Sequence, residues 1–426
     1  MGLISGTALD VHPPLYYLIL KLFCTIFGFS GTVYHVVSTI PFALVVIFSL
    51  TIVWKELGEI TATILVVCES LLYCSMYFNV EVRMYSWASL FILLSYWYFR
   101  KLLLDANIKN YTLFSLFSLF AAYTHYFCIL TVIPFYVVIL FMGIKEKGKR
   151  VKLFVLSWGM TIGLYLPWAI SFFVHYTDTK EKIYSAGYTN VWVCVKFIFD
   201  TKFWWVLLSM FVLLTIWTIV RNSVQYEKIW IISGIAGIAL TILIPYIISV
   251  VMSPIMEKRH VYPSFVIAWL LLGYSISKQK YKVPLLCITL VLVIPTGFLT
   301  IYRANVNEKK CVVALDDFLG KTSGLIDNSG TLISSDWQIA YPLYQYYYDK
   351  DDSMLFLETD EEILDYMNKS IDNEFLIFFE REITESFIDE LESENSKVEL
   401  ITENQHFGAH RVWVLKYQRD LGNKTI

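Results

Sequence analysis

The sequence predicts a polytopic α-helical membrane protein that ends in a small water-soluble α/β domain. Hydrophobic residues make up 57% of the 426 residues, charged residues only 17%, and the mean hydropathy is +0.56. A soluble domain of this length carries considerably more charge. Apolar stretches of about 18 residues or more recur as far as residue 302, and each can cross roughly 30 Å of hydrocarbon as a helix.

Ten apolar segments have the length expected of a transmembrane helix. They lie near residues 33–54, 59–77, 84–100, 110–124, 127–144, 153–174, 203–220, 229–251, 261–277 and 283–302. We therefore expect a transmembrane domain over residues 32–302.

The apolar stretch in front of the first span is too short to cross the membrane. It is interrupted by Lys21, which favours a helix lying in the membrane interface, anchored by Tyr16 and Tyr17. Residues 1–31 are therefore expected to form a loop and an interfacial helix.

The connections between the expected spans alternate in positive charge. One set carries 14 Lys and Arg residues and the other carries seven. The positive-inside rule places the richer set in the cytoplasm. The N-terminus, the connections at 78–83, 175–202 and 252–260, the turn at His125 and the C-terminal domain then share the non-cytoplasmic face.

Residues 303–426 form a distinct, acidic part of the chain, with 25 acidic and 12 basic side chains. The predicted elements are strands at 331–335, 374–379 and 411–416 and amphipathic helices at 340–348, 361–368 and 385–394. This alternation indicates a small α/β domain. Because it has no glycine-rich phosphate loop, nucleophile elbow or HExxH helix, we expect it to cap or dock rather than to catalyse.

The seven cysteines form no CxxC pair and no Cys/His cluster. Most of them lie in apolar segments, where a cysteine is usually a small core residue. The sequence therefore predicts no metal site built from cysteine or histidine clusters.

Asp10 and His12 stand directly before Pro13-Pro14. The diproline keeps this segment extended and prevents a helix from starting earlier. An acid and an imidazole are thus held at the expected outer face of the membrane. They either serve the function or form an ordinary polar loop.

Glu81 and Arg83 lie in a very short outer connection. Charges this close to hydrocarbon usually face a polar cavity or one another. Because the two residues are two positions apart, they do not share a helix face, and each is expected to have its own partner. Arg83 could bind a phosphate with its planar fork, or it could snorkel to the interface. Glu69, deeper in a span, is expected to be structural.

Two further polar features fall on the same face. His125 lies at a turn between two spans, where it could bind a substrate or anchor the turn in the interface. Lys258, Arg259 and His260 break the positive-inside pattern, so they call for an anion, either a lipid headgroup or a phosphorylated substrate. Together these groups suit a ligand that is partly lipid and partly anionic and sugar-like.

These motifs resemble those of a known family. The run DVHPPLYY at 10–17, followed by FGFS at 27–30, is similar to the DxHPPLYY…FGxS signature of membrane glycosyltransferases with the GT-C fold. This protein mannosyltransferase-like group includes the lipid A aminoarabinose transferase and the Rgt lipopolysaccharide transferases. The run EVRMY at 81–85, the turn at 123–126 and the segment 253–260 resemble further family elements in the same order.

The resemblance implies a GT-C fold of about ten spans and an inverting transferase. Such an enzyme takes a sugar from a polyprenyl-phosphate carrier and passes it to a glycan, lipid or protein of the cell envelope on the non-cytoplasmic face. It implies that His12 contacts the donor phosphate, that Arg83 and Arg259 assist, and that tyrosines line the cavity. The expected substrate-binding set is His12, Tyr16, Tyr17, Arg83, Tyr85, His125, Lys258 and Arg259.

The chain departs from the family pattern at its N-terminal end. Family members carry another span before this motif, followed by an acidic residue, often in an Asp-Glu pair, that acts as general base. Only nine residues precede Asp10, so on this resemblance the first helix is absent and Asp10, or next Glu81, is the expected catalytic acid–base residue. His260 stands where Tyr is usual and His35 where Arg is usual. The resemblance leaves a divalent cation open as a cofactor.

Two other classes of protein remain open. A transporter or flippase of lipid-linked sugars would be expected to show internal repeats and helices broken near the midplane. The sequence shows no repeat, and its unusual charges lie at the outer edge of the spans. A truncated or inactive paralogue would keep a binding role without catalysis.

Overall fold

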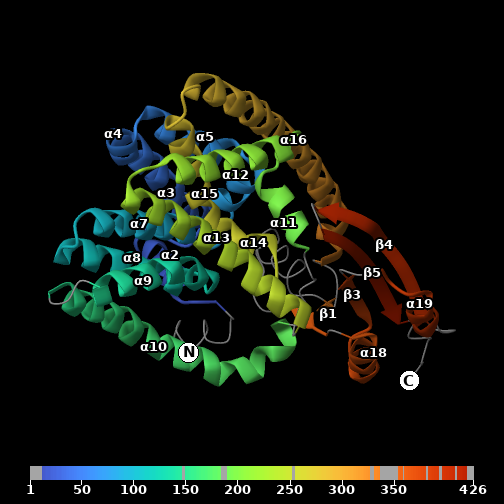
Figure 1. The fold of residues 1–426 in the computed structure, drawn as a ribbon. Helices are drawn as coiled ribbons and strands as arrows, with labels where there is room; N and C mark the ends of the chain where they lie inside the picture. The colour runs from blue at the N-terminus through green and yellow to red at the C-terminus, as the bar shows by residue number, and fades with distance from the viewer. Residues whose placement is uncertain are drawn as a thin grey trace, which may run out of the picture. The chain divides into compact units, whose positions relative to one another are not determined.

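The computed structural model describes ten stretches of the chain. They are residues 12–145, 149–183, 190–251, 255–326, 331–335, 354–357, 359–379, 382–392, 396–407 and 410–419. Contacts between residues divide the chain into two compact units, Met1–Thr300 and Ile301–Ile426 (Figure 1).

The first unit is built from helices, and each of the ten predicted spans forms a helix or a broken helix. The elements are α2 (Leu15–Phe27), α3 (Gly31–Phe48), the π-helical segment η1 (Ser49–Val53), α4 (Trp54–Leu57), α5 (Glu59–Leu71), α6 (Tyr73–Val80), α7 (Tyr85–Leu104), α8 (Ile108–Thr124), α9 (Phe127–Lys145), α10 (Lys149–Ile183), α11 (Val191–Ile198), α12 (Trp204–Arg221), α13 (Gln225–Val251), α14 (Lys258–Val261), the 3₁₀ turn η2 (Tyr262–Ser264), α15 (Phe265–Ser277) and α16 (Lys282–Ile326).

Seven helices in the described part of the chain are long and apolar enough to cross a membrane. The number is eight if α5 and α6, which meet at Leu72 with a bend of 69°, count as one span. The spans expected at 84–100 and 110–124 form α7 and α8 but are not among the seven. α8 has only 17 residues, and α7 is enclosed by neighbouring helices, so its side chains need not be apolar toward lipid.

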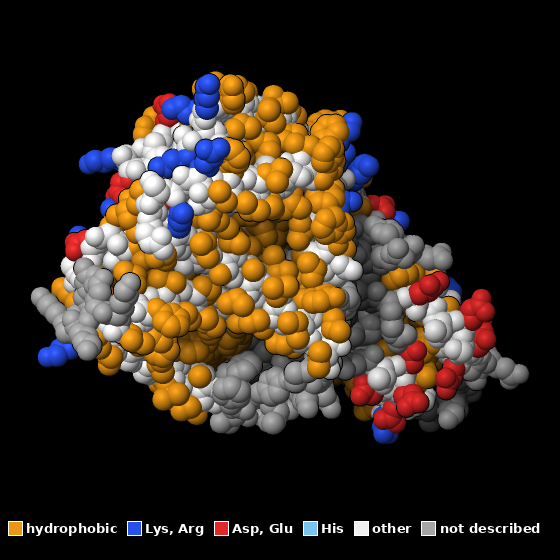
Figure 2. Space-filling view, viewed as in Figure 1, with side chains coloured by type: hydrophobic (Ala, Val, Ile, Leu, Met, Phe, Trp, Pro, Cys, Tyr) orange, Lys and Arg blue, Asp and Glu red, His pale blue; other side chains and the backbone are white. Residues whose placement is uncertain are grey.

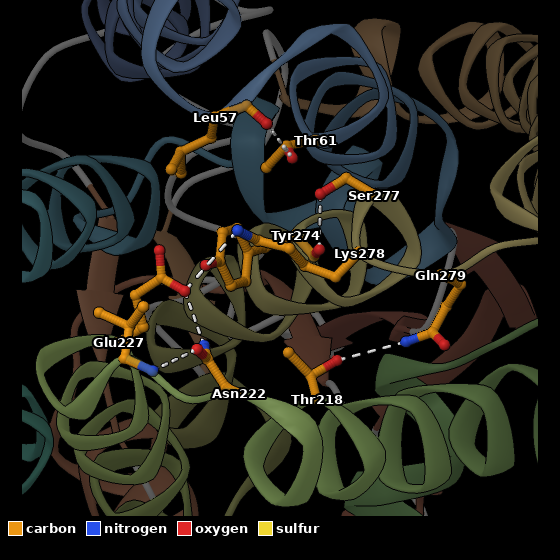
Figure 3. Close-up of polar contacts among 10 residues, drawn as sticks. Leu57, Thr61, Thr218, Asn222, Glu227, Tyr274, Ser277, Lys278 and Gln279 are labelled. Carbon is orange, nitrogen blue, oxygen red and sulfur yellow. Dashed lines mark hydrogen bonds and ion pairs between the residues drawn. The ribbon is translucent and has the colours of Figure 1, made fainter.

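The first unit has the surface expected of a membrane protein. Hydrophobic side chains cover most of the face seen in Figure 2, and Lys and Arg side chains gather at one end of it. A polar cluster joins the α12–α13 connection to the end of α15, where Glu227 accepts a hydrogen bond from Asn222 at 2.6 Å and lies 3.7 Å from the Lys278 ammonium (Figure 3). Arg100, near the end of α7, lines one polar cavity together with Glu227 and Lys278. Tyr85 begins α7, so it lies about 22 Å away along the helix axis.

Glu69 is buried inside α5, and its polar contacts are with α6 and η2. The Asn79 amide donates to the backbone carbonyl of Glu69 at 3.1 Å. The Tyr262 hydroxyl lies 2.9 Å from Oδ1 of Asn79 and 3.3 Å from Oε2 of Glu69. This network joins α5, α6 and η2, which adjoin the segments that carry Glu81 and Arg259.

Helix α2 forms where an interfacial helix was expected, but Tyr16 does not point to the interface. Its side chain is buried, and its hydroxyl lies 2.9 Å from Oγ of Ser38 on α3. Leu22 and Ile26, on other positions of the helix, are exposed. Tyr16 therefore lies on the face that packs against the bundle, and the helix leaves an apolar face exposed.

The second unit contains a mixed five-stranded sheet in the order β2-β1-β3-β5-β4. Its elements are β1 (Thr331–Ser334), β2 (Met354–Phe356), α18 (Asp360–Lys369), β3 (Glu374–Phe379), α19 (Glu385–Leu391), β4 (Ser396–Phe407) and β5 (His410–Arg419). β1 pairs in parallel with β2 and β3, and β5 pairs antiparallel with β3 and β4. The α/β domain predicted for this part of the chain is therefore confirmed.

The individual elements of the second unit agree in part with the prediction. β1, β3, β5, α18 and α19 form at the expected places, and α18 begins with a capping box between Thr359 and Glu362. Strands β2 and β4 were not predicted, because β2 has three residues and β4 is a largely polar edge strand. The helix expected at 340–348 lies outside the described residues.

Candidate functional site

The connection between α6 and α7 carries Glu81 and Arg83. The backbone N–H of Arg83 donates to the carbonyl of Glu81 at 2.7 Å, which makes the connection a tight turn. Oε2 of Glu81 is buried, and no described residue forms a hydrogen bond with it. A buried carboxylate oxygen without a partner is costly, so the atom is available to a ligand.

The charges of two arginines, Arg83 and Arg259, act on the Glu81 carboxyl. Burial raises the pKa of the Glu81 carboxyl above its ordinary value, and the positive charges of Arg83 and Arg259 oppose this shift. Arg83 comes from the same connection, whereas Arg259 comes from α14, far away in the sequence. A carboxyl whose pKa is raised exchanges its proton closer to neutral pH.

Arg259 has a carboxylate partner of its own. Its Nη2 donates to Oε1 of Glu257 at 2.8 Å, and its Nε lies 2.7 Å from Oε2 of the same side chain. Glu257 is the residue that precedes α14. This ion pair holds the guanidinium within reach of Glu81 while leaving it partly exposed.

His125 is buried in the turn between α8 and α9 and is 4% exposed. Its ring centre lies 5.8 Å from that of Tyr85 and 5.5 Å from that of His260. Its Nδ1 has no hydrogen-bond partner among the described residues. Burial lowers the pKa of His125 well below the ordinary value, and the nearby charges of His260, His12 and Arg259 lower it further. The imidazole is therefore neutral at pH 7.

His260 is held between two elements. Its ring stacks on Phe127 with 4.5 Å between the ring centres and 10° between the planes. Its Nδ1 lies 2.8 Å from the carbonyl oxygen of Ile255. The histidine that stands at the family's tyrosine position is thus a packed part of the turn.

The structure brings together most of the residues that the sequence singled out. Glu81, Arg83, Tyr85, His125 and Arg259 form one cluster, and His12 lies close enough to act on the charge of His125. Asp10 lies outside the described residues.

Three expected ligand-binding residues have other contacts in the structure. The Tyr16 hydroxyl is bound to Ser38, although the Arg83 charge reaches it. The Tyr17 ring packs edge-on against Tyr16 at 5.4 Å. The Lys258 ammonium lies 4.9 Å from the centre of the Phe197 ring on α11.

The sequence reasoning missed Glu257 as part of this cluster. The signal was available, because an acid and a base two positions apart in a short irregular segment can pair, as they do here. A helical spacing rule does not apply to such a segment, so it does not predict this pair.

The described residues do not form a metal cage. They contain no group of three or more His, Cys, Asp or Glu side chains that could hold a metal ion. Among the expected site residues of the cluster, Oε2 of Glu81 and Nδ1 of His125 are the buried atoms that could bind a metal and have no hydrogen-bond partner in the described part of the chain. Two such atoms are fewer than a protein cation site normally provides.

The fold matches that of solved membrane transferase structures. ArnT from Cupriavidus metallidurans in the apo state superposes with a TM-score of 0.58 at 10% sequence identity, over 94% of this chain and 87% of the ArnT chain. The ArnT structure bound to undecaprenyl phosphate gives a TM-score of 0.55 with the same identity and coverage. The chain has the ArnT fold.

ArnT is an aminoarabinose transferase with a GT-C fold, so the fold class that the motifs implied is confirmed. No protein-family model and no curated protein matches the sequence. The motif resemblance rests on short runs of residues, whereas the likeness to ArnT rests on the course of the backbone. Two independent observations therefore agree on the architecture.

Proposed function

We propose that this chain is a membrane glycosyltransferase that moves a sugar from a polyprenyl-phosphate carrier to an acceptor hydroxyl of the cell envelope. The ArnT fold supports this proposal, as does the undecaprenyl phosphate in one of the ArnT structures. The observation that carries it is the Glu81 carboxyl, which has a raised pKa and an unbonded oxygen beside Arg83 and Arg259.

The chemistry follows from the three side chains. Glu81, as the carboxylate, accepts the proton of the acceptor hydroxyl, and the oxygen attacks the anomeric carbon of the donor sugar. The bond from that carbon to the carrier phosphate breaks, and the phosphate leaves with the electron pair. Arg83 and Arg259 stabilise the negative charge that develops on it. A single displacement of this kind inverts the anomeric centre.

The surrounding residues position the donor. His125, as a neutral imidazole, can offer its unpartnered Nδ1 to a sugar or phosphate oxygen without adding charge. His12 acts on the charge of His125 and stands at the family position for the donor phosphate. Tyr85 supplies an aromatic face beside His125, and Lys258 adds positive charge next to Arg259. The reaction takes place on the non-cytoplasmic face that the charge pattern predicts for this cluster.

A transfer assay on the purified full chain tests this proposal. The chain is incubated with a panel of polyprenyl-phosphate sugars and envelope acceptors, and release of polyprenyl phosphate is measured. We expect Glu81→Gln to lower the rate at least about a hundredfold, because the base is removed. Glu59→Gln, an exposed carboxylate at the other end of the unit, is the matched control and should keep the wild-type rate.

Two outcomes of this assay would overturn parts of the proposal. If Asp10→Asn abolishes transfer and Glu81→Gln does not, the base is Asp10. If the intact donor crosses a bilayer without release of polyprenyl phosphate, the chain is a flippase of lipid-linked sugars and not a transferase.

A further inference from the structure

A second polar cavity lies at the opposite end of the first unit from Glu81. Its volume is about 580 Å³, which is within the range of small-ligand sites. It is lined by the last turns of the α3–η1–α4 span, the end of α7 and the start of α8. Lys55, Lys101 and Lys109 come from these three elements and share this one cavity.

The lysines of this cavity outnumber its carboxylates, which are Glu56 and Asp105. Glu56 is already bound twice, by Lys101 at 2.6 Å and by Arg100 at 3.0 Å. No ion pair or hydrogen bond joins the side chain of Lys55 or Lys109 to another residue in the described part of the chain. The cavity therefore carries excess positive charge.

In the neighbouring cavity at this end of the bundle, by contrast, a lysine is paired with a carboxylate. There Lys278 faces Glu227, which also binds Asn222, so the charges are compensated within the protein (Figure 3). Lys55 and Lys109 lack such compensation, although carboxylates are available nearby. An anion from outside the described residues would supply it.

The apolar part of the cavity wall indicates the source of that anion. Ile52 and Leu104 line the cavity and are 40% and 46% exposed, and Trp97 also lines it, with the Lys101 ammonium 5.8 Å from its ring centre. Ile52 lies near the end of the candidate span Gly31–Leu57, so the cavity is at the level of the membrane boundary. A ligand here would contact both lysines and apolar side chains.

We propose that this cavity binds the phosphate headgroup of an anionic phospholipid, with the acyl chains running along Ile52 and Leu104. Basic pockets between transmembrane helices are suited to such headgroups. The Asn107 side chain, which also lines the cavity, can hydrogen-bond to headgroup oxygens. The site is independent of the transfer reaction, because it lies at the other end of α7 from Tyr85 and uses none of the residues around Glu81.

Thermal unfolding of the full chain in detergent tests the proposal. Phosphatidylglycerol, phosphatidylcholine and inorganic phosphate are added at equal phosphorus concentration. We expect phosphatidylglycerol to raise the melting temperature of the wild type more than either other addition. In Lys55→Ala/Lys109→Ala this rise should be lost, since two lysines near an anionic headgroup account for roughly thirtyfold in affinity. Lys282→Ala, an exposed lysine of the neighbouring cavity, should respond as the wild type.

Native mass spectrometry gives a second readout that does not depend on the melting curve. The wild type should retain one more phosphatidylglycerol molecule than either single variant, Lys55→Ala or Lys109→Ala. An equal response of the double variant and the wild type would overturn the site. A full response to inorganic phosphate alone would overturn the lipid as its source.

Discussion

Arg259 is held by Glu257 through two short contacts, 2.8 Å from Nη2 to Oε1 and 2.7 Å from Nε to Oε2. The positive charge of the same guanidinium also opposes the raised pKa of Glu81, so Arg259 interacts electrostatically with two carboxylates. In the proposed reaction the donor phosphate is a third anion that approaches Arg259. Glu257 therefore both positions this arginine and competes for it.

Removing this competition should favour the donor. Glu257→Gln keeps the shape of the side chain and removes its charge, so the KM for the polyprenyl-phosphate donor should fall by up to about fivefold, the range of a partly exposed ion pair. The kcat should change little, because Glu81 is intact. Steady-state kinetics over a range of donor concentrations measure this split. A large fall in kcat with an unchanged KM would show that Glu257 acts on the chemical step instead.

The pH dependence of transfer should report Glu81. Protonated Glu81 cannot accept a proton, so kcat/KM should fall as the pH drops through its pKa. Because burial raises that pKa, the fall should lie at higher pH than the value of about 4.3 of an ordinary glutamate. A fall centred at or below the ordinary value would contradict the assignment.

A variant of His125 tests whether the fall of kcat/KM at low pH, the acid limb, comes from Glu81 or from a histidine. Burial lowers the pKa of His125 well below its ordinary value, whereas it raises the pKa of Glu81. The acid limb should therefore stay at the same pH in His125→Asn, whatever the overall rate of that variant. If the acid limb is absent in His125→Asn, the titrating group is His125 and not Glu81.

Gly237 allows α13 to approach α9 closely. A Cβ atom at this position would stand 2.5 Å from the backbone carbonyl oxygen of Thr131. Gly237→Ala should therefore destabilise the bundle by about 1–3 kcal/mol, because a backbone oxygen cannot move aside cheaply. Gly163→Ala on α10, where no atom lies within 4 Å, should be neutral or slightly stabilising. Thermal melts of both variants in the same detergent provide the comparison.

Hydrophobic length and charge alternation were sufficient to predict much of the architecture. The ten apolar segments all form helices or broken helices, because a helix satisfies its own backbone hydrogen bonds within hydrocarbon. Hydropathy places the end of the last span near residue 302, but α16 continues as one helix to Ile326, because a change to polar residues does not break a helix that meets no proline there. These patterns also missed the edge strand β4, which depends on pairing with β5 more than on its own polar sequence.

The candidate site was predictable only in part, because the sequence indicates which face a residue lies on but not where its side chain points. Glu81, Arg83 and Arg259 could be assigned to one face because the loop charges fix which ends of the spans lie together. Side-chain directions depend on packing, which a single sequence does not specify. The inward position of Tyr16 against Ser38 and the pairing of Glu257 with Arg259 are two such cases.

Binding of undecaprenyl phosphate to the purified full chain tests the central claim most directly, because it requires neither the donor sugar nor the acceptor to be known. Native mass spectrometry or a thermal-shift titration can compare the wild type with Arg83→Ala and Arg259→Ala. We expect each variant to bind about ten- to a hundredfold more weakly, the range of a lost charge-assisted hydrogen bond. Arg221→Ala at the end of α12 should bind as the wild type. Equal affinity in all four proteins would contradict the account.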